Sequence, residues 1–201
     1  MATPIPAALV QKLRETTGAA MMDCKRALEE AGGDFEKAKD QLRIKGLKTA
    51  EKKAGRATAQ GAIGHYLHHD GRKAVLVEVN CETDFVARND KFKEFARGLA
   101  MHVAACKPQW VRKEDVPADA IEKEKALIEA ESAGEMAKKP EAARAKIVEG
   151  RLQKYYAQHC LLEQPWVLDD SRRVEEVRKD LVASLGENVS VRRFSRIEVG
   201  E

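Results

Sequence analysis

Apolar residues recur at helical spacing over three stretches near the amino terminus, residues 6–18, 20–33 and 34–46. Each stretch ends at glycine, and two of them begin at a proline or an aspartate, residues that suit a helix start. Helices this short bury little surface, so the pattern predicts a small, marginally stable helical bundle over residues 1–46. Residues 47–60 are mostly Ala, Lys, Glu and Arg without a broad apolar stripe, which predicts a solvated helical linker.

The alternation of apolar and polar residues that is typical of strands appears further along the chain. It runs over residues 61–67 and 75–81, and Asp70-Gly71 between them forms a strong two-residue hairpin turn. In a third run, residues 188–199, three arginines break the alternation and predict a bulge or an exposed edge: Arg192, Arg193 and Arg196. Together the three runs predict one antiparallel sheet.

Helical spacing returns over residues 92–106, which Pro108 terminates, and over residues 174–185 before Gly186. Both helices are expected to pack against the sheet. Residues 113–160 predict a helical hairpin with its turn at residues 134–140, and their sparse apolar positions favour a protruding arm. The predicted fold class is therefore α+β, with a core over residues 61–201.

Composition narrows the class of protein. Charged residues make up 34% of the chain while the net charge is only +3, a mixture that suits exposed helices better than a nucleic-acid surface. No apolar stretch approaches the roughly 18 residues that a membrane span needs, and residues 1–6 lack the pattern of a secretion signal. Four scattered cysteines predict reduced core residues in a cytoplasmic protein.

Candidate chemistry is sparse. His65, His68 and His69 lie close in sequence, but a zinc site would want thiolates or further imidazoles that converge. No nucleophile elbow, phosphate-binding loop or dinucleotide-binding turn is present. We therefore expect no catalytic residue, no metal site and no cofactor, and hence a protein that is not an enzyme.

The most informative segment is the run Asn80–Asn89, which connects the second predicted strand to the helix that begins near Phe92. Asn89 or Asp90 can cap that helix, so Thr83-Asp84-Phe85 lies in a short turn. From pattern alone, Phe85 is expected to fold back into the core. The alternative is that Asp84-Phe85 forms a wedge presented to a partner.

Four segments resemble the signatures of one family, translation elongation factor Ts, in its order. They are residues 17–28, the Thr-Asp-Phe-Val run at residues 83–86, the Met-His-Val run at residues 101–103 with Lys107-Pro108, and residues 148–151. The resemblance covers about residues 9–200. It implies a ubiquitin-associated-like fold for the amino-terminal helices and the function of a guanine-nucleotide exchange factor for the GTPase elongation factor Tu.

The resemblance also implies roles for single residues. Phe85 would insert into the partner near its magnesium and phosphate site, with Thr83, Asp84 and Val86 shaping the tip. Further contacts to the partner would come from four residues: Leu13, Met21, Met22 and His102. From pattern alone His102 is a satisfied interior histidine, so its role as a contact rests on the resemblance.

A homodimer is expected as well. Long members of the family carry the core as two tandem, diverged halves, whereas this chain holds a single hairpin signal, the short, single-core form. A sheet with helices on one face leaves an open apolar face that a second copy can cover. Two other functions stay open from the residues: a ubiquitin-like binding adaptor, and a ribosome- or RNA-associated structural protein suggested by the basic last strand.

Overall fold

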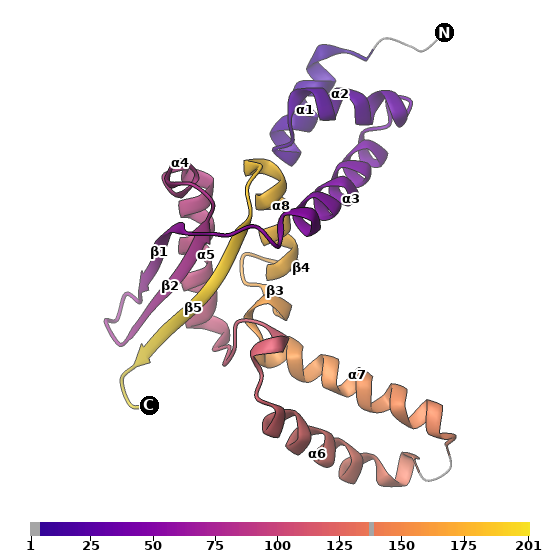
Figure 1. Cartoon of the computed structure of the whole chain (residues 1–201), viewed down its shortest axis with the longest axis vertical. Helices are drawn as coiled ribbons and strands as arrows, with labels where there is room; N and C mark the ends of the chain where they lie inside the picture. Colours follow the sequence, from indigo (N-terminus) through magenta and orange to yellow (C-terminus); the bar gives the residue numbers. More distant parts are fainter. Residues whose placement is uncertain (1–4, 137–138) are drawn as a thin grey trace.

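The computed structural model describes residues 5–136 and 139–201. The secretion-signal prediction rests largely on residues 1–4, which lie outside the described residues, as do residues 137 and 138 of the predicted hairpin turn. The amino-terminal helices are α1 (Ala7–Thr17), α2 (Met21–Glu30) and α3 (Phe35–Lys53). They form a small bundle at one end of the molecule (Figure 1).

This bundle has its own apolar core, and its helix ends match the sequence signals. Leu13, Cys24, Leu28 and Ala38 are fully buried in it. The chain leaves α1 through Gly18 in the left-handed region (φ +69°), as a helix C-terminus requires. Asp34 caps α3, since its Oδ1 accepts a hydrogen bond from the Lys37 amide at 3.1 Å.

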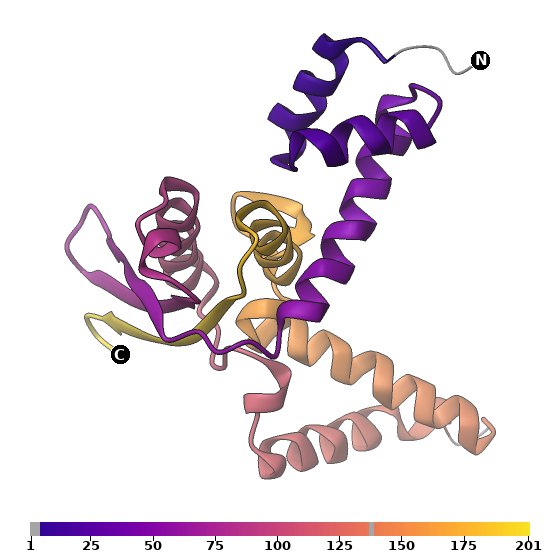
Figure 2. The ribbon, with the colours of Figure 1, turned by 45° about the horizontal axis from the view of Figure 1, so that its top comes forward.

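The third helix does not end near Gly46, as the sequence pattern predicted; it continues to Lys53. Gly46 is there for packing, because a Cβ at this position would lie 3.1 Å from the Cβ of Ala183. Ala50 is buried in the core formed with the sheet, and Arg43 Nη2 pairs with Glu176 Oε1 at 2.7 Å. The first part of the expected solvated linker is therefore a rigid helix that packs along α8 (Figure 2).

The described residues contain the predicted antiparallel sheet, formed by β1 (Gln60–Leu67), β2 (Lys73–Cys81) and β5 (Val189–Glu198) in the order β1-β2-β5. The predicted bulge is confirmed. Glu78 pairs with Arg193 while the next residue of β2, Val79, pairs with Val191, so Arg192 is the extra residue.

Helices cover one face of this sheet. α5 (Asp90–Cys106) packs against β1 and β2, and α8 (Val174–Leu185) lies beside it (Figure 1). At Gly64 the helix approaches so closely that a Cβ would lie 2.1 Å from the carbonyl oxygen of Ala96. The inward residues of the sheet form the main core with α5: Val75, Val77, Val79, Phe92, Leu99 and Val103.

The remaining segments form the arm and its base. The arm is a hairpin of α6 (Ala118–Met136) and α7 (Glu141–His159), with short helical turns η1 (Lys113–Asp115) and η2 (Leu161–Glu163) at its base. It projects away from the core, as predicted (Figures 1 and 2). The small hairpin of β3 (Pro165–Trp166) and β4 (Asp169–Arg173) was not predicted, and its Trp166 side chain is buried in the core.

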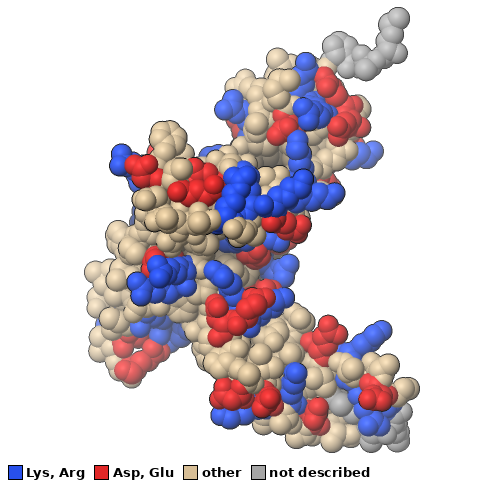
Figure 3. Space-filling view, viewed as in Figure 1, with Lys and Arg blue, Asp and Glu red and all other residues tan. Residues whose placement is uncertain are grey.

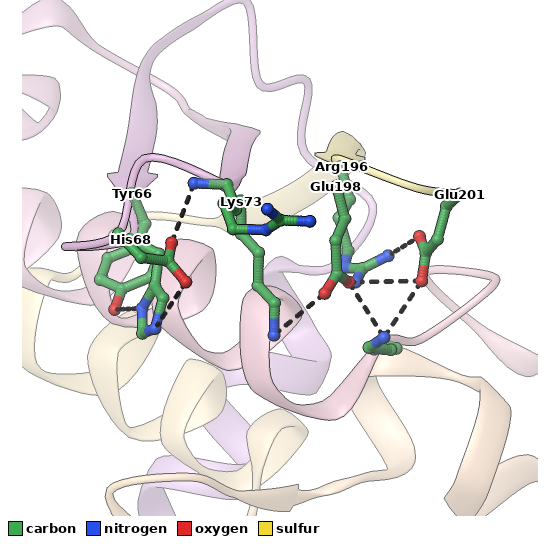
Figure 4. A network of polar contacts seen from close by, with 9 residues as sticks. Tyr66, His68, Lys73, Arg196, Glu198 and Glu201 are labelled. Carbon is green, nitrogen blue, oxygen red and sulfur yellow. Dashed lines mark hydrogen bonds and ion pairs between the residues drawn. The ribbon is translucent and has the colours of Figure 1, made fainter.

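An ion-pair network ties together the end of the sheet that lies farthest from the β2–α5 connection (Figure 4). Lys107 Nζ lies 3.0 Å from both Glu198 Oε2 and Glu201 Oε1, and Lys73 Nζ lies 3.2 Å from Glu198 Oε1. Arg196 pairs with the same two carboxylates. The network fixes the last strand to the end of α5. Across the described residues, no helix is both long and apolar enough for a membrane span.

Candidate functional site

The Thr-Asp-Phe-Val run forms a one-turn helix, α4 (Asp84–Ala87), between β2 and α5. Thr83 caps it, with its Oγ1 accepting a hydrogen bond from the Val86 amide at 3.4 Å. Asn89 caps α5 through the Lys91 amide at 2.9 Å, as predicted. Both ends of the connection are therefore fixed by local side-chain hydrogen bonds.

Adjacent apolar residues of α4 have opposite environments. Val86 is buried in the main core, whereas Phe85 is 81% exposed. The expectation from pattern alone, that Phe85 folds back into the core, is therefore wrong. Asp84 is also exposed and pairs with Arg88 at 3.0 Å, a contact between solvated groups that contributes little. The tip thus presents a large aromatic ring on a base that Val86 anchors.

A glutamate from a distant part of the sequence also holds this tip. Glu187, which follows α8, accepts hydrogen bonds from the Thr83 amide at 3.0 Å and from Thr83 Oγ1 at 2.7 Å. Sequence reasoning did not find it. The available signal was Gly186, whose left-handed conformation (φ +75°) ends α8 just before Glu187, but nothing in the pattern pairs that loop with residue 83.

The amino-terminal candidates divide into exposed and buried residues. Met21 and Met22 are 43% and 65% exposed on α2, so both side chains are accessible to a partner. Leu13 has no exposed surface in the isolated chain, so its expected contact with a partner stays a prediction. Leu13 belongs to the apolar stripe of α1 that packs the amino-terminal bundle, and it thereby helps to set the shape of that bundle.

A cleft of about 660 Å³ lies between the amino-terminal helices and the start of α5. One wall comes from α1 and α2 and includes Met21, and the other comes from the start of α5 at Asn89–Lys91, directly after α4. Ser184 lies between the walls, 3.3 Å from Lys91 Nζ and 3.4 Å from the Gly18 carbonyl oxygen. The space-filling view shows a notch between α4 and the amino-terminal helices (Figure 3).

His102 lies in the interior. Its Nδ1 accepts from the Val167 amide at 3.1 Å, so the ring proton is on Nε2, which donates to Gln164 Oε1 at 2.9 Å. Its ring stacks on Trp166 with centroids 5.5 Å apart, and burial lowers the pKa of the imidazole. The interpretation from pattern alone, a satisfied interior histidine, is confirmed. The partner contact that the resemblance implies for this fully buried side chain stays a prediction.

The cysteines offer little chemistry. Cys24, Cys81 and Cys160 are buried free thiols, and burial raises the pKa of Cys160 to about 11. Cys106 is exposed at the end of α5, contrary to the expectation that it is a core residue. Among residues 5–136 and 139–201, no cluster of three histidine, cysteine or acidic side chains is placed to hold a metal ion.

Comparison with known proteins identifies the family. A family model described as elongation factor TS matches residues 7–201. The chain is 56% identical over 193 residues to elongation factor Ts of Thermotoga petrophila, covering 96% of this chain and 95% of that protein. It is 53% identical over 197 residues to elongation factor Ts of Desulforamulus reducens, covering 98% of this chain and 90% of that protein.

The chain belongs to the elongation factor Ts family. Elongation factor Ts is the nucleotide exchange factor for elongation factor Tu in translation elongation, and it is not an enzyme. Membership covers the whole described fold, from the helical bundle to the last strand. The family match does not itself assign roles to Phe85, to the methionines of α2 or to Glu187.

Proposed function

We propose that this protein, which serves translation elongation in the cytoplasm, accelerates GDP release from elongation factor Tu by inserting Phe85 into the partner near its magnesium and phosphate site. The observation that carries this proposal is the 81% exposure of Phe85 on a tip whose base is fixed by Val86 and Thr83. A solvated aromatic ring of this size adds nothing to the stability of the isolated chain. It gains its burial when a partner covers it.

The tip needs no chemistry of its own for this function. GDP in a GTPase is held by backbone amides of a phosphate loop and by a magnesium ion that bridges to the phosphates. A wedge that binds the empty partner more tightly than the loaded one must weaken nucleotide binding by the same factor, because the coupling between the two sites is reciprocal. Thr83, Asp84 and Val86 fix the shape and direction of the wedge.

A second contact is proposed for the amino-terminal helices. Met21 lines the same cleft as the residues that follow α4, and the next residue of α2, Met22, is exposed. Flexible, polarisable methionine side chains suit a surface that must form and dissolve in each cycle. The bundle and the tip would therefore contact one partner from the same side.

The two other functions that the sequence left open are less favoured. The arginines of β5 do not form a free basic surface: Arg192 and Arg193 pair with Glu78 at 3.1 and 2.8 Å, and Arg196 pairs with Glu198 and Glu201. Blue and red residues are accordingly interspersed over the visible face (Figure 3). A ubiquitin-like adaptor would leave the exposed tip without a role.

We test the function by following release of labelled GDP from purified elongation factor Tu with catalytic amounts of this chain. Faster release that turns over many partner molecules per chain supports the proposal. No acceleration would refute it. Titration with salt distinguishes an RNA-binding role, because phosphate contacts make affinity fall steeply as salt rises.

A homodimer is proposed as the working form. The face of the sheet opposite α5 bears four exposed apolar side chains that are 55–69% exposed: Ile63, Leu67, Leu76 and Ile197. The register places Leu67, Ala74 and Ile197 in one row across the sheet and His65, Leu76 and Ser195 in the next. A second copy related by a two-fold axis would cover this face symmetrically, without a disulfide.

A further inference from the structure

Helix α4 is too short to fix its own orientation. A four-residue helix contains a single turn, and isolated helices of this length are unstable because nucleation is costly. Val86 anchors its base in the core, but the ring of Phe85 is solvated and, among the described residues, makes no core contact that would orient it. Contacts from outside the helix must therefore determine the direction in which the ring is presented.

Those contacts come from the loop between α8 and β5, residues 186–188. The carboxylate of Glu187 receives both donors of Thr83, the amide at 3.0 Å and the hydroxyl at 2.7 Å. The threonine hydroxyl can donate to Glu187 and still accept from the Val86 amide. In return, Glu82 Oε1 accepts a hydrogen bond from the Asn188 amide at 2.6 Å. Glu82 and Thr83 are thus bound reciprocally to two consecutive loop residues.

The same loop is bonded to the end of α3. The Asn188 side chain is buried, and its Nδ2 donates to the carbonyl oxygens of Arg56 at 2.9 Å and Ala54 at 3.3 Å. Lys53 Nζ also donates to the Gly186 carbonyl oxygen. Since α3 carries the amino-terminal bundle, one loop fixes the tip and the bundle relative to each other.

We infer that Glu187 is a positioning residue for nucleotide exchange: through Thr83 it sets the direction in which α4 presents Phe85 to the partner. This inference rests on the proposed function of Phe85. Glu187 need not touch the partner. Its carboxylate provides two charge-assisted hydrogen bonds, which are stronger than neutral ones, to the residue that begins the presenting helix.

The experiment measures GDP release from elongation factor Tu over a range of concentrations of the chain, which separates the maximal rate from the half-saturating concentration. Glu187→Ala is expected to lower the maximal rate on the order of tenfold, the effect of losing hydrogen bonds to a charged group. The half-saturating concentration should change less than about twofold, since the methionines of α2 are untouched. Glu131→Ala is the control, because Glu131 pairs with Arg151 at 3.2 Å within the protruding arm of α6 and α7.

A second arm tests whether Glu187 acts through Phe85. In a Phe85→Ala chain, adding Glu187→Ala should slow exchange no further, because the ring that Glu187 positions is gone. A role in general stability would reduce exchange in both backgrounds alike. Thr83→Val, which keeps the amide donor and loses the hydroxyl, should give a smaller loss than Glu187→Ala. Thr83→Ser, which restores the hydroxyl, should recover most of the rate that Thr83→Val loses.

Each outcome separates the inference from the proposal beneath it. If Phe85→Ala slows exchange and Glu187→Ala does not, the positioning role is refuted while the wedge stands. An equal further loss on adding Glu187→Ala to Phe85→Ala also refutes it. If Phe85→Ala leaves exchange unchanged, the wedge fails and this inference fails with it. Should Glu187→Ala fold poorly by thermal unfolding, the Thr83→Val and Thr83→Ser pair decides the question.

Discussion

Replacing Phe85 with alanine tests the wedge with a magnitude that follows from exposure. A phenylalanine buries about 200 Å² when fully covered, and Phe85 is 81% exposed, so about 160 Å² is open to a partner. At ~25 cal/mol per Å², covering half of this area contributes about 2 kcal/mol, and covering all of it contributes about 4 kcal/mol. If the interaction forms on the way to GDP release, the catalysed rate should fall by at least about thirtyfold.

The assay follows fluorescent GDP leaving elongation factor Tu after mixing with excess unlabelled nucleotide and a limiting amount of the chain. Thermal unfolding is measured in parallel and should be nearly unchanged, because the side chain that is removed is solvated. Leu127→Ala is the control, since Leu127 is a 57% exposed apolar residue on α6, away from the tip. Phe85→Leu keeps most of the apolar surface and should lie between the two.

The reasoning is refuted by either of two results. In the first, Phe85→Ala unfolds at a temperature several degrees lower while exchange per folded molecule is unchanged, which would mean that the ring stabilises the fold. In the second, Leu127→Ala slows exchange as much as Phe85→Ala does, so that loss of any exposed apolar residue produces the effect.

Four further predictions follow from other parts of the structure. Replacing both exposed methionines of α2 with alanine should raise the half-saturating concentration about tenfold at an unchanged maximal rate; a reduced maximal rate alone would contradict docking. Light scattering at micromolar concentration should give about twice 22.4 kDa, and Leu76→Arg should give the monomer mass; an active wild-type monomer would refute the dimer. Burial lowers the pKa of His102 below 6.5, so as pH falls from 6.5 only the unfolded chain takes up this proton and the free energy of unfolding drops. In urea unfolding, the free energy of unfolding of His102→Gln should depend less on pH below 6.5 than that of the wild type. An unchanged pH dependence would contradict the assignment to His102. Gly64→Ala forces a Cβ against the Ala96 carbonyl and should cost about 1–3 kcal/mol in thermal unfolding, whereas Gly55→Ala, with open space around it, should cost little; equal losses would contradict the packing argument.

Most of the fold follows from periodicity and from residues that begin or end elements. The alternating run over residues 75–81 gave β2, and the break at the arginines of residues 192 and 193 gave the bulge. These signals are local, so a sequence window contains them. The error at Gly46 arises because the deciding contact, with Ala183, is distant in sequence. A glycine that permits this close packing looks the same in sequence as a glycine that ends a helix.

The candidate site was predictable only in part. The run at residues 83–86 was identified by resemblance, and pattern alone favoured a buried Phe85, because exposed aromatic residues are uncommon and period arguments fail in a four-residue helix. Leu13 and His102 were proposed as partner contacts from the resemblance, whereas the apolar stripes of their helices indicate the buried positions that both occupy in the isolated chain. Glu187 was out of reach, because its contact with Thr83 joins residues 104 positions apart.

The continuous helix α3 affects how the two proposed contacts with the partner, at the Phe85 tip and at the amino-terminal bundle, combine. Its 19 residues span about 28 Å at ~1.5 Å per residue, and its end is bonded to the core, so the bundle is held on a strut and not on a flexible tether. When one contact has formed, a strut whose length matches the span gives the second contact a high effective concentration. Each contact can then be weak alone and still add up to firm capture. In the proposed complex, loss of either contact would return the partner to a weakly bound state, so the protein would leave as soon as nucleotide re-enters its partner.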